Sequence, residues 1–142
     1  MKLLTYGIIS APILAVGLYL FLSPKSHSSI STEDVDSSFT VSSEAPLALW
    51  SSGSAYALVT GEVNGTGLVR VVGNHGRDLK EFTVGPGIVE LAYGGGEMWI
   101  EDFHLSYQPL SASQGHLTAS VYCGTKMSET DWKRYHEILR KK

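Results

Sequence analysis

Asp102, His104 and His116 are the residues of this 142-residue chain whose side chains could combine to do chemistry. Imidazole and carboxylate groups bind zinc and act as general acids and bases, so their convergence from adjacent strands would create a small hydrolase or metal-dependent site. The alternative is three polar residues on the solvent face of a sheet. Because no H-E-x-x-H, C-x-x-C or nucleophile-elbow pattern accompanies them, we favour the alternative and predict no catalytic, cofactor or metal residue.

Ser106 adds a hydroxyl to the Asp102 and His104 series but does not make a triad. Alternate residues of a strand lie side by side, whereas a triad requires each group to orient the next. Ser106 therefore does not change the prediction of a non-enzymatic domain.

Residues 64–66, Asn-Gly-Thr, match the acceptor pattern for N-glycosylation, which is used only in a secretory pathway that glycosylates. Asn-Gly is also the strongest short hairpin signal, because both residues accept positive φ. We therefore favour a structural turn over a glycan at Asn64 and predict that the flanking runs pair with each other. The predicted register places Val63 opposite Thr66, Thr60 opposite Val69 and Leu58 opposite Val71.

Three further features have simple structural explanations. Arg77, within residues 73–78 (GNHGRD), could hold an anion among loop amides, but no helix follows as a phosphate loop requires. Cys123 is the only cysteine, so no intramolecular disulfide forms, and we expect it to be buried. The basic residues 140–142 complement a helix dipole more simply than they bind acidic lipid.

A net charge of −3 without a basic patch argues against nucleic-acid binding.

The segment from Leu3 to Leu22 contains no charged residue and has the length that a helix needs to cross about 30 Å of hydrocarbon. We predict that it is a retained single-pass anchor, with the N-terminus cytoplasmic and the following domain extracytoplasmic. The alternative is a cleaved signal peptide, for which the apolar run is long and the small-residue pattern at residues 26–28 is poor.

The rest of the chain divides by composition. Residues 23–45 are rich in serine and are predicted to be a linker, with a short strand around Phe39 and Val41 at its end. Residues 46–127 contain short apolar runs separated by glycines, which predicts a compact antiparallel β-sandwich or partly open barrel. Within residues 97–107, alternate residues are predicted to face the core, and the residues between them are predicted to face solvent. The core positions are Trp99, Phe103, Leu105 and Tyr107, and the wet positions are Asp102, His104 and Ser106.

A short amphipathic helix is predicted over residues 128–142. Ser128 is a suitable N-cap, and Glu129 and Asp131 place negative charge in the first turn. The apolar stripe of this helix consists of Trp132, Tyr135 and Leu139.

Residues 60–71 (TGEVNGTGLVRV) resemble the central hairpin of small single-pass cytochrome oxidase assembly factors. The helical segment expected between anchor and sheet in those proteins is missing, so no family is assigned. The sequence predicts a mainly β, membrane-anchored, non-enzymatic interaction or assembly module. Its expected partners are the membrane, through Leu3 to Leu22, and an envelope protein, with no nucleic acid, small-molecule ligand or cofactor.

Overall fold

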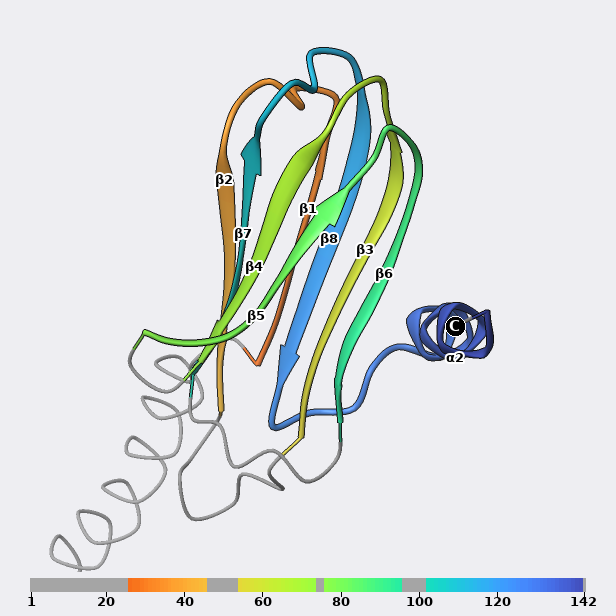
Figure 1. The fold of residues 1–142 in the computed structure, drawn as a ribbon. Helices are drawn as coiled ribbons and strands as arrows, with labels where there is room; N and C mark the ends of the chain where they lie inside the picture. The colour runs from red at the N-terminus through yellow and green to blue at the C-terminus, as the bar shows by residue number, and fades with distance from the viewer. Residues whose placement is uncertain (1–25, 46–53, 74–75, 96–101, 142) are drawn as a thin grey trace, which may run out of the picture.

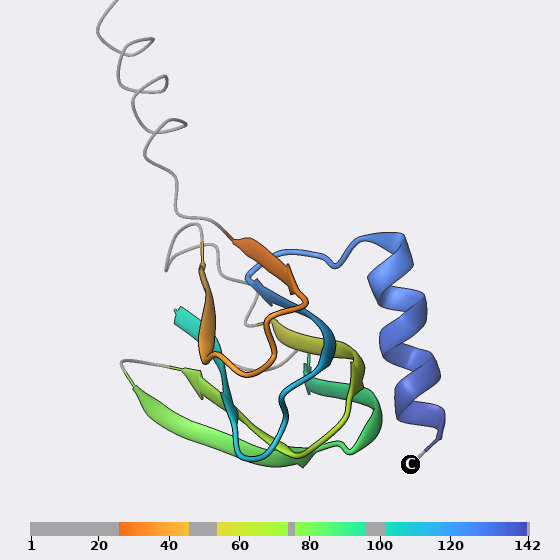
Figure 2. The same cartoon turned by 90° about the horizontal axis from the view of Figure 1, so that it is seen from above.

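The computed structural model describes residues 26–45, 54–73, 76–95 and 102–141. Their strands form two antiparallel four-stranded sheets that face each other, with one helix outside (Figures 1 and 2). Sheet I has the order β1 (His27–Thr32), β8 (Gly115–Cys123), β3 (Ala55–Val63) and β6 (Gly87–Gly95). Sheet II has the order β2 (Phe39–Glu44), β7 (Asp102–Pro109), β4 (Gly67–Gly73) and β5 (Arg77–Val84). The helix is α2 (Glu129–Arg140).

The core lies between the two sheets and is built from alternate residues of each strand. In β7, Phe103, Leu105 and Tyr107 are buried, while the residues between them are half-buried on the outer face. The predicted alternation is confirmed for this strand, and Trp99 lies outside the described residues. Sheet I supplies the opposing core side chains, which include Ala57, Val59, Leu117, Ala119 and Val121. The predicted β-sandwich is therefore present, with each sheet contributing its inner face.

The predicted hairpin across Asn64-Gly65 is wrong, because β3 and β4 belong to different sheets. β3 pairs with β6 and β8, and β4 pairs with β5 and β7. Thr60 therefore lies opposite Glu90 and Thr118, and Val69 lies opposite Phe82 and Tyr107. An Asn-Gly signal encodes reversal of the chain, but pairing depends on which strands bury each other's apolar faces.

Residues 23–45 were predicted to be a linker, but His27–Thr32 and Phe39–Glu44 within this range form β1 and β2, one in each sheet. The short strand expected around Phe39 and Val41 is β2. β1 was missed because an edge strand needs few large apolar residues when its polar side chains find partners. Ser29 Oγ lies 2.9 Å from Ser120 Oγ, and Ser31 Oγ lies 2.9 Å from Thr118 Oγ1, both across the β1–β8 pair.

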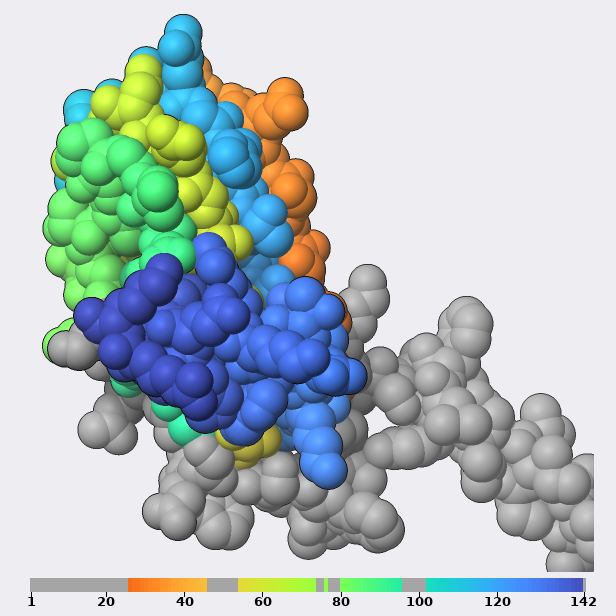
Figure 3. Space-filling model, turned by 90° about the vertical axis from the view of Figure 1, so that its right-hand side faces the viewer, coloured from red at the N-terminus to blue at the C-terminus, as the bar shows by residue number. Residues whose placement is uncertain are grey.

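Helix α2 begins as the sequence predicts, since the Ser128 side chain accepts a hydrogen bond from the backbone N–H of Asp131. Its buried face differs from the predicted stripe. Tyr135 and Ile138 are buried, whereas Trp132 and Leu139 remain 43% and 41% exposed. The helix packs on the outer face of sheet I, where it covers the lower part of the face and leaves the upper part uncovered in this view (Figure 3). Its contacts there include Leu58, Ala92 and Tyr122.

Within the described ranges no helix is long and apolar enough to span a bilayer. The predicted anchor, Leu3 to Leu22, falls outside those ranges.

Candidate functional site

The structure brings Asp102 and His104 together on the outer face of sheet II. Asp102 Oδ2 lies 3.5 Å from His104 Nε2, and both side chains are partly exposed. Ser42, the β2 register partner of His104, places its Oγ 2.7 Å from His104 Nδ1. Ser42 cannot be recognised from the sequence alone, because only the pairing of β2 with β7 places it beside His104.

His116 does not join this group. It lies on β8 in sheet I, opposite Glu62 of β3. The neighbouring residues Leu117 and Ala119 show that odd-numbered positions of β8 face the core, so the exposed His116 faces outward. The three residues therefore do not converge, because the chain changes sheets between β7 and β8.

The Ser42, His104 and Asp102 row contains the chemical groups of a hydrolase triad but not the surroundings of one. A triad works on a substrate held against converging oxyanion donors in a site that excludes water. Ser42 is exposed on the outer face of a sheet. Among the described residues, no cluster of three His, Cys, Asp or Glu side chains is placed to hold a metal. The group is best explained as polar surface contacts of sheet II, one across the β2–β7 pair and one along β7.

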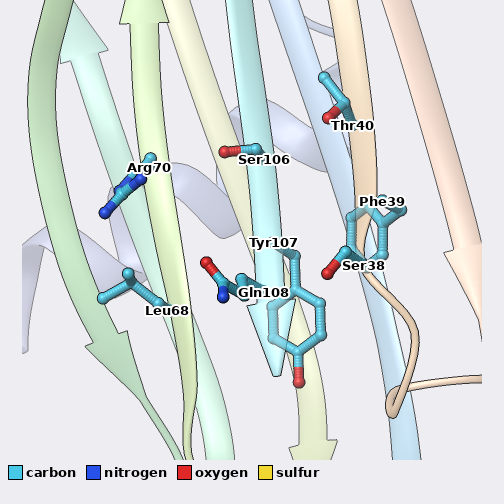
Figure 4. Close-up of a pocket in the computed structure, with 8 residues that line it drawn as sticks. All are labelled: Ser38, Phe39, Thr40, Leu68, Arg70, Ser106, Tyr107 and Gln108. Carbon is cyan, nitrogen blue, oxygen red and sulfur yellow. The ribbon is translucent and has the colours of Figure 1, made fainter. Parts of the chain in front are cut away.

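A polar groove runs across three strands of the same outer face (Figure 4). It has a volume of about 280 Å³. Thr40 of β2, Ser106 of β7 and Arg70 of β4 are register partners and form one row across it. Gln108 and Leu68 form the next row, so hydroxyl, amide and guanidinium groups stand side by side with a small apolar contact. Ser38, Phe39 and Tyr107 complete the lining.

The positive charge of Arg70 in the groove is balanced by Glu81 at the margin of the groove. Arg70 Nε lies 2.7 Å from Glu81 Oε2 on β5, and each side chain is about half exposed. An exposed pair of this kind contributes little to stability, about 0 to 1 kcal/mol. The groove thus presents donors suited to an extended polar or acidic segment.

Asn64 connects the β3–β4 loop to the β7–β8 loop. Its Oδ1 accepts hydrogen bonds from the backbone N–H groups of Ser113 and Gln114, each at 3.0 Å, and its Nδ2 donates to Ser113 Oγ at 3.1 Å. Position 65 requires glycine, because a Cβ there would lie 2.4 Å from the Ser111 carbonyl oxygen. These contacts account for Asn-Gly without a glycan, whose attachment would require the amide nitrogen that Ser113 engages.

Two other predicted candidates have structural roles. Cys123 is fully buried, as expected, and burial together with the nearby Asp102 carboxylate raises the pKa of its thiol to about 11. Lys141 Nζ and Arg134 Nη2 bind the Glu90 carboxylate at 2.7 and 2.6 Å, and the Lys141 hydrogen bond lowers the pKa of Glu90. At least one C-terminal cation thus attaches the helix to β6. The side chain of Arg77 lies outside the described part of the structure.

No family model and no curated relative matches this sequence. Among solved structures, the chain is similar to a pilus protein of Bacillus endospore appendages, at 12% identity and a TM-score of 0.41 over 68% of this chain and 84% of that one. It is also similar to the carbohydrate-binding module CsCBM6-3 from Clostridium stercorarium, at 12% identity and a TM-score of 0.39 over 73% of this chain and 98% of that one. Similarities at this level carry no inference about function, and the fold assignment rests on the observed strand pairing.

Proposed function

We propose that the chain is a single-pass, membrane-anchored extracytoplasmic β-sandwich that binds an envelope protein and catalyses no reaction. The observation that carries the proposal is the difference between the two outer faces. Helix α2 lies on sheet I, whereas no described element covers the outer face of sheet II (Figure 2). That face carries the polar rows and the groove, where a partner would gain hydrogen bonds from preformed strands.

Two observations on the residues favour binding over catalysis. The Asp102–His104 pair does not line the groove, although His104 lies two residues from Ser106 on the same face of β7, and His116 lies in the other sheet. The groove itself is lined by hydroxyl, amide and guanidinium groups, which recognise polar partners through hydrogen bonds.

Retention of the anchor is supported by the position of β1. The small-residue pattern at residues 26–28 would direct cleavage after Ser28, inside β1. Cleavage there would remove His27, whose ring stacks on Tyr122 at a centroid distance of 4.1 Å. Such a cut would shorten an edge strand and expose a buried ring, so a retained segment is more compatible with the folded domain.

The proposal is tested by photo-crosslinking in native membranes. A photoreactive residue replaces Ser106 or Gln108 in the groove of the full-length chain, and the matched control replaces Glu62, which is exposed on the outer side of sheet I. We expect discrete protein adducts from the two groove positions and none from Glu62. Equal labelling at all three positions, or none at the groove, would show that sheet II is not the binding face.

A separate experiment tests the anchor. Alkaline carbonate extraction followed by mass measurement should leave full-length chain in the membrane pellet. Soluble material starting near Ser29 would refute retention but not export, and full-length chain in the cytosolic fraction would refute both.

A further inference from the structure

We infer that the end of the sandwich at which β1 begins rests on the lipid surface, and that the contact is made by an aromatic hollow beside α2. We call it the interfacial hollow and define it by Tyr56, Lys126, Met127, Glu129 and Trp132, which line a volume of about 440 Å³. The inference depends on the proposed membrane anchor. It goes beyond that proposal in assigning which surface faces the bilayer.

The tether between the predicted membrane span and the sandwich is short. Strand β1 begins at His27, five residues after Leu22, where the predicted membrane span ends. Five residues reach at most about 18 Å when fully extended. The headgroup region adds only about 5 to 7 Å on each side of the hydrocarbon, so β1 cannot start far from the bilayer. The long linker that the composition suggested would have allowed a much larger distance.

The register of sheet I places Tyr56 close to the start of β1. His27 pairs with Tyr122, and Tyr122 pairs with Tyr56, so the three residues form one row across β1, β8 and β3. Tyr56 is therefore two strands from His27, a separation of about 10 Å. The connection from β8 to α2 leaves from this same end of the sheet (Figure 1). The interfacial hollow thus lies at the end where the tether enters.

The interfacial hollow combines aromatic rings with a lysine at its rim. The rings of Trp132 and Tyr56 meet edge to face at a centroid distance of 6.0 Å, and Trp132 is 43% exposed. Indole and phenol rings prefer the headgroup level of a bilayer. Lys126 is exposed at the rim, where its alkyl stem can follow the apolar surface while its ammonium reaches a lipid phosphate. Glu129, which lines the hollow, is paired with Lys133 at 2.8 Å, and Asp131 on the same helix turn accepts a hydrogen bond from Tyr122.

The tether also decides between occupants. The hollow lies about 10 Å from His27, which the tether holds within about 18 Å of the end of the span, so the hollow meets lipid at a high effective concentration and even a weak affinity keeps it docked. Docking of the hollow would fix the orientation of the sandwich, with the loops at Asn64 directed away from the membrane.

The test uses the full-length chain in proteoliposomes of phosphatidylcholine and phosphatidylglycerol. A fluorescent label is attached to a cysteine introduced as Thr130→Cys, in the exposed first turn of α2. The matched control carries the label at Glu62→Cys, on β3 of sheet I, the sheet on which α2 packs. Glu62 is six residues from Tyr56 along β3, about 20 Å toward the other end. The buried Cys123 stays unlabelled because burial raises the pKa of its thiol to about 11.

We expect lipids carrying a nitroxide in the headgroup to quench the label at position 130 several-fold more strongly than the label at position 62. A Lys126→Glu variant, in which an exposed side chain changes and folding is preserved, should weaken the quenching at 130 in anionic vesicles. Equal quenching at the two positions in carbonate-resistant protein would overturn the docking and leave the anchor intact. Full-length chain that carbonate extracts would overturn the anchor and the docking together. Protection of the label only in native membranes would assign the hollow to a protein and also overturn the inference.

Discussion

Replacement of Asn64 by alanine should open the contact between the β3–β4 and β7–β8 loops. The asparagine side chain makes three hydrogen bonds, two from backbone N–H groups to Oδ1 and one from Nδ2 to Ser113 Oγ. A net contribution of about 0.5 to 1.5 kcal/mol per bond, reduced because water reaches this loop, gives a loss of roughly 1 to 3 kcal/mol. Asn64→Asp should cost less than about 1 kcal/mol, because a carboxylate still accepts both backbone N–H groups and the Ser113 hydroxyl can turn to donate.

Amide hydrogen exchange of the full-length chain in detergent micelles measures this effect locally. The amides of Ser113 and Gln114 should exchange about 5- to 150-fold faster in Asn64→Ala, which is the estimated free energy expressed as a rate ratio. The amide of Val59, in the middle of β3, serves as an internal control. Exchange at Ser113 and Gln114 within twofold of the unsubstituted protein would refute the reasoning, and so would an Asn64→Asp variant as disrupted as Asn64→Ala.

Three further predictions concern the core and the helix. Tyr107→Phe should lower the free energy of unfolding, measured by urea denaturation, by about 1 to 3 kcal/mol, because the buried Tyr107 hydroxyl donates to the Val35 carbonyl at 3.0 Å. An unchanged midpoint of urea denaturation would show that water satisfies that carbonyl. Iodoacetamide at pH 8 should modify Cys123 only after unfolding, because a thiol of pKa about 11 is about one thousandth thiolate at that pH; rapid modification of native protein would contradict its burial. Glu90→Gln should lower the melting temperature near neutral pH. It should also make the melting temperature fall less steeply as the pH is lowered. The Lys141 hydrogen bond lowers the pKa of Glu90, so its contribution is present above the ordinary carboxyl pKa and is lost as pH falls through the lowered value; an unchanged acid profile would contradict this.

Much of the local structure follows from the sequence alone. The alternation of Phe103, Leu105 and Tyr107 with polar residues predicts the two faces of β7, because side chains of a strand point alternately to opposite sides. Ser128 predicts the start of α2, because its side chain can satisfy a backbone N–H that the first turn leaves unpaired. These features depend on residues close together in the chain, so a short window contains the information that determines them.

Strand partners and the composition of the candidate site depend on the tertiary structure. Ser42 and His104 are 62 residues apart, and no local pattern pairs them. His116 is much closer to His104 in sequence, yet it lies in the other sheet because the chain crosses between layers. The Asn64-Gly65 turn likewise joins two sheets instead of closing a hairpin. The physical reason is that apolar faces are buried only when both sheets close on each other, and burial of the whole core selects one set of strand partners among the many that local turns would permit.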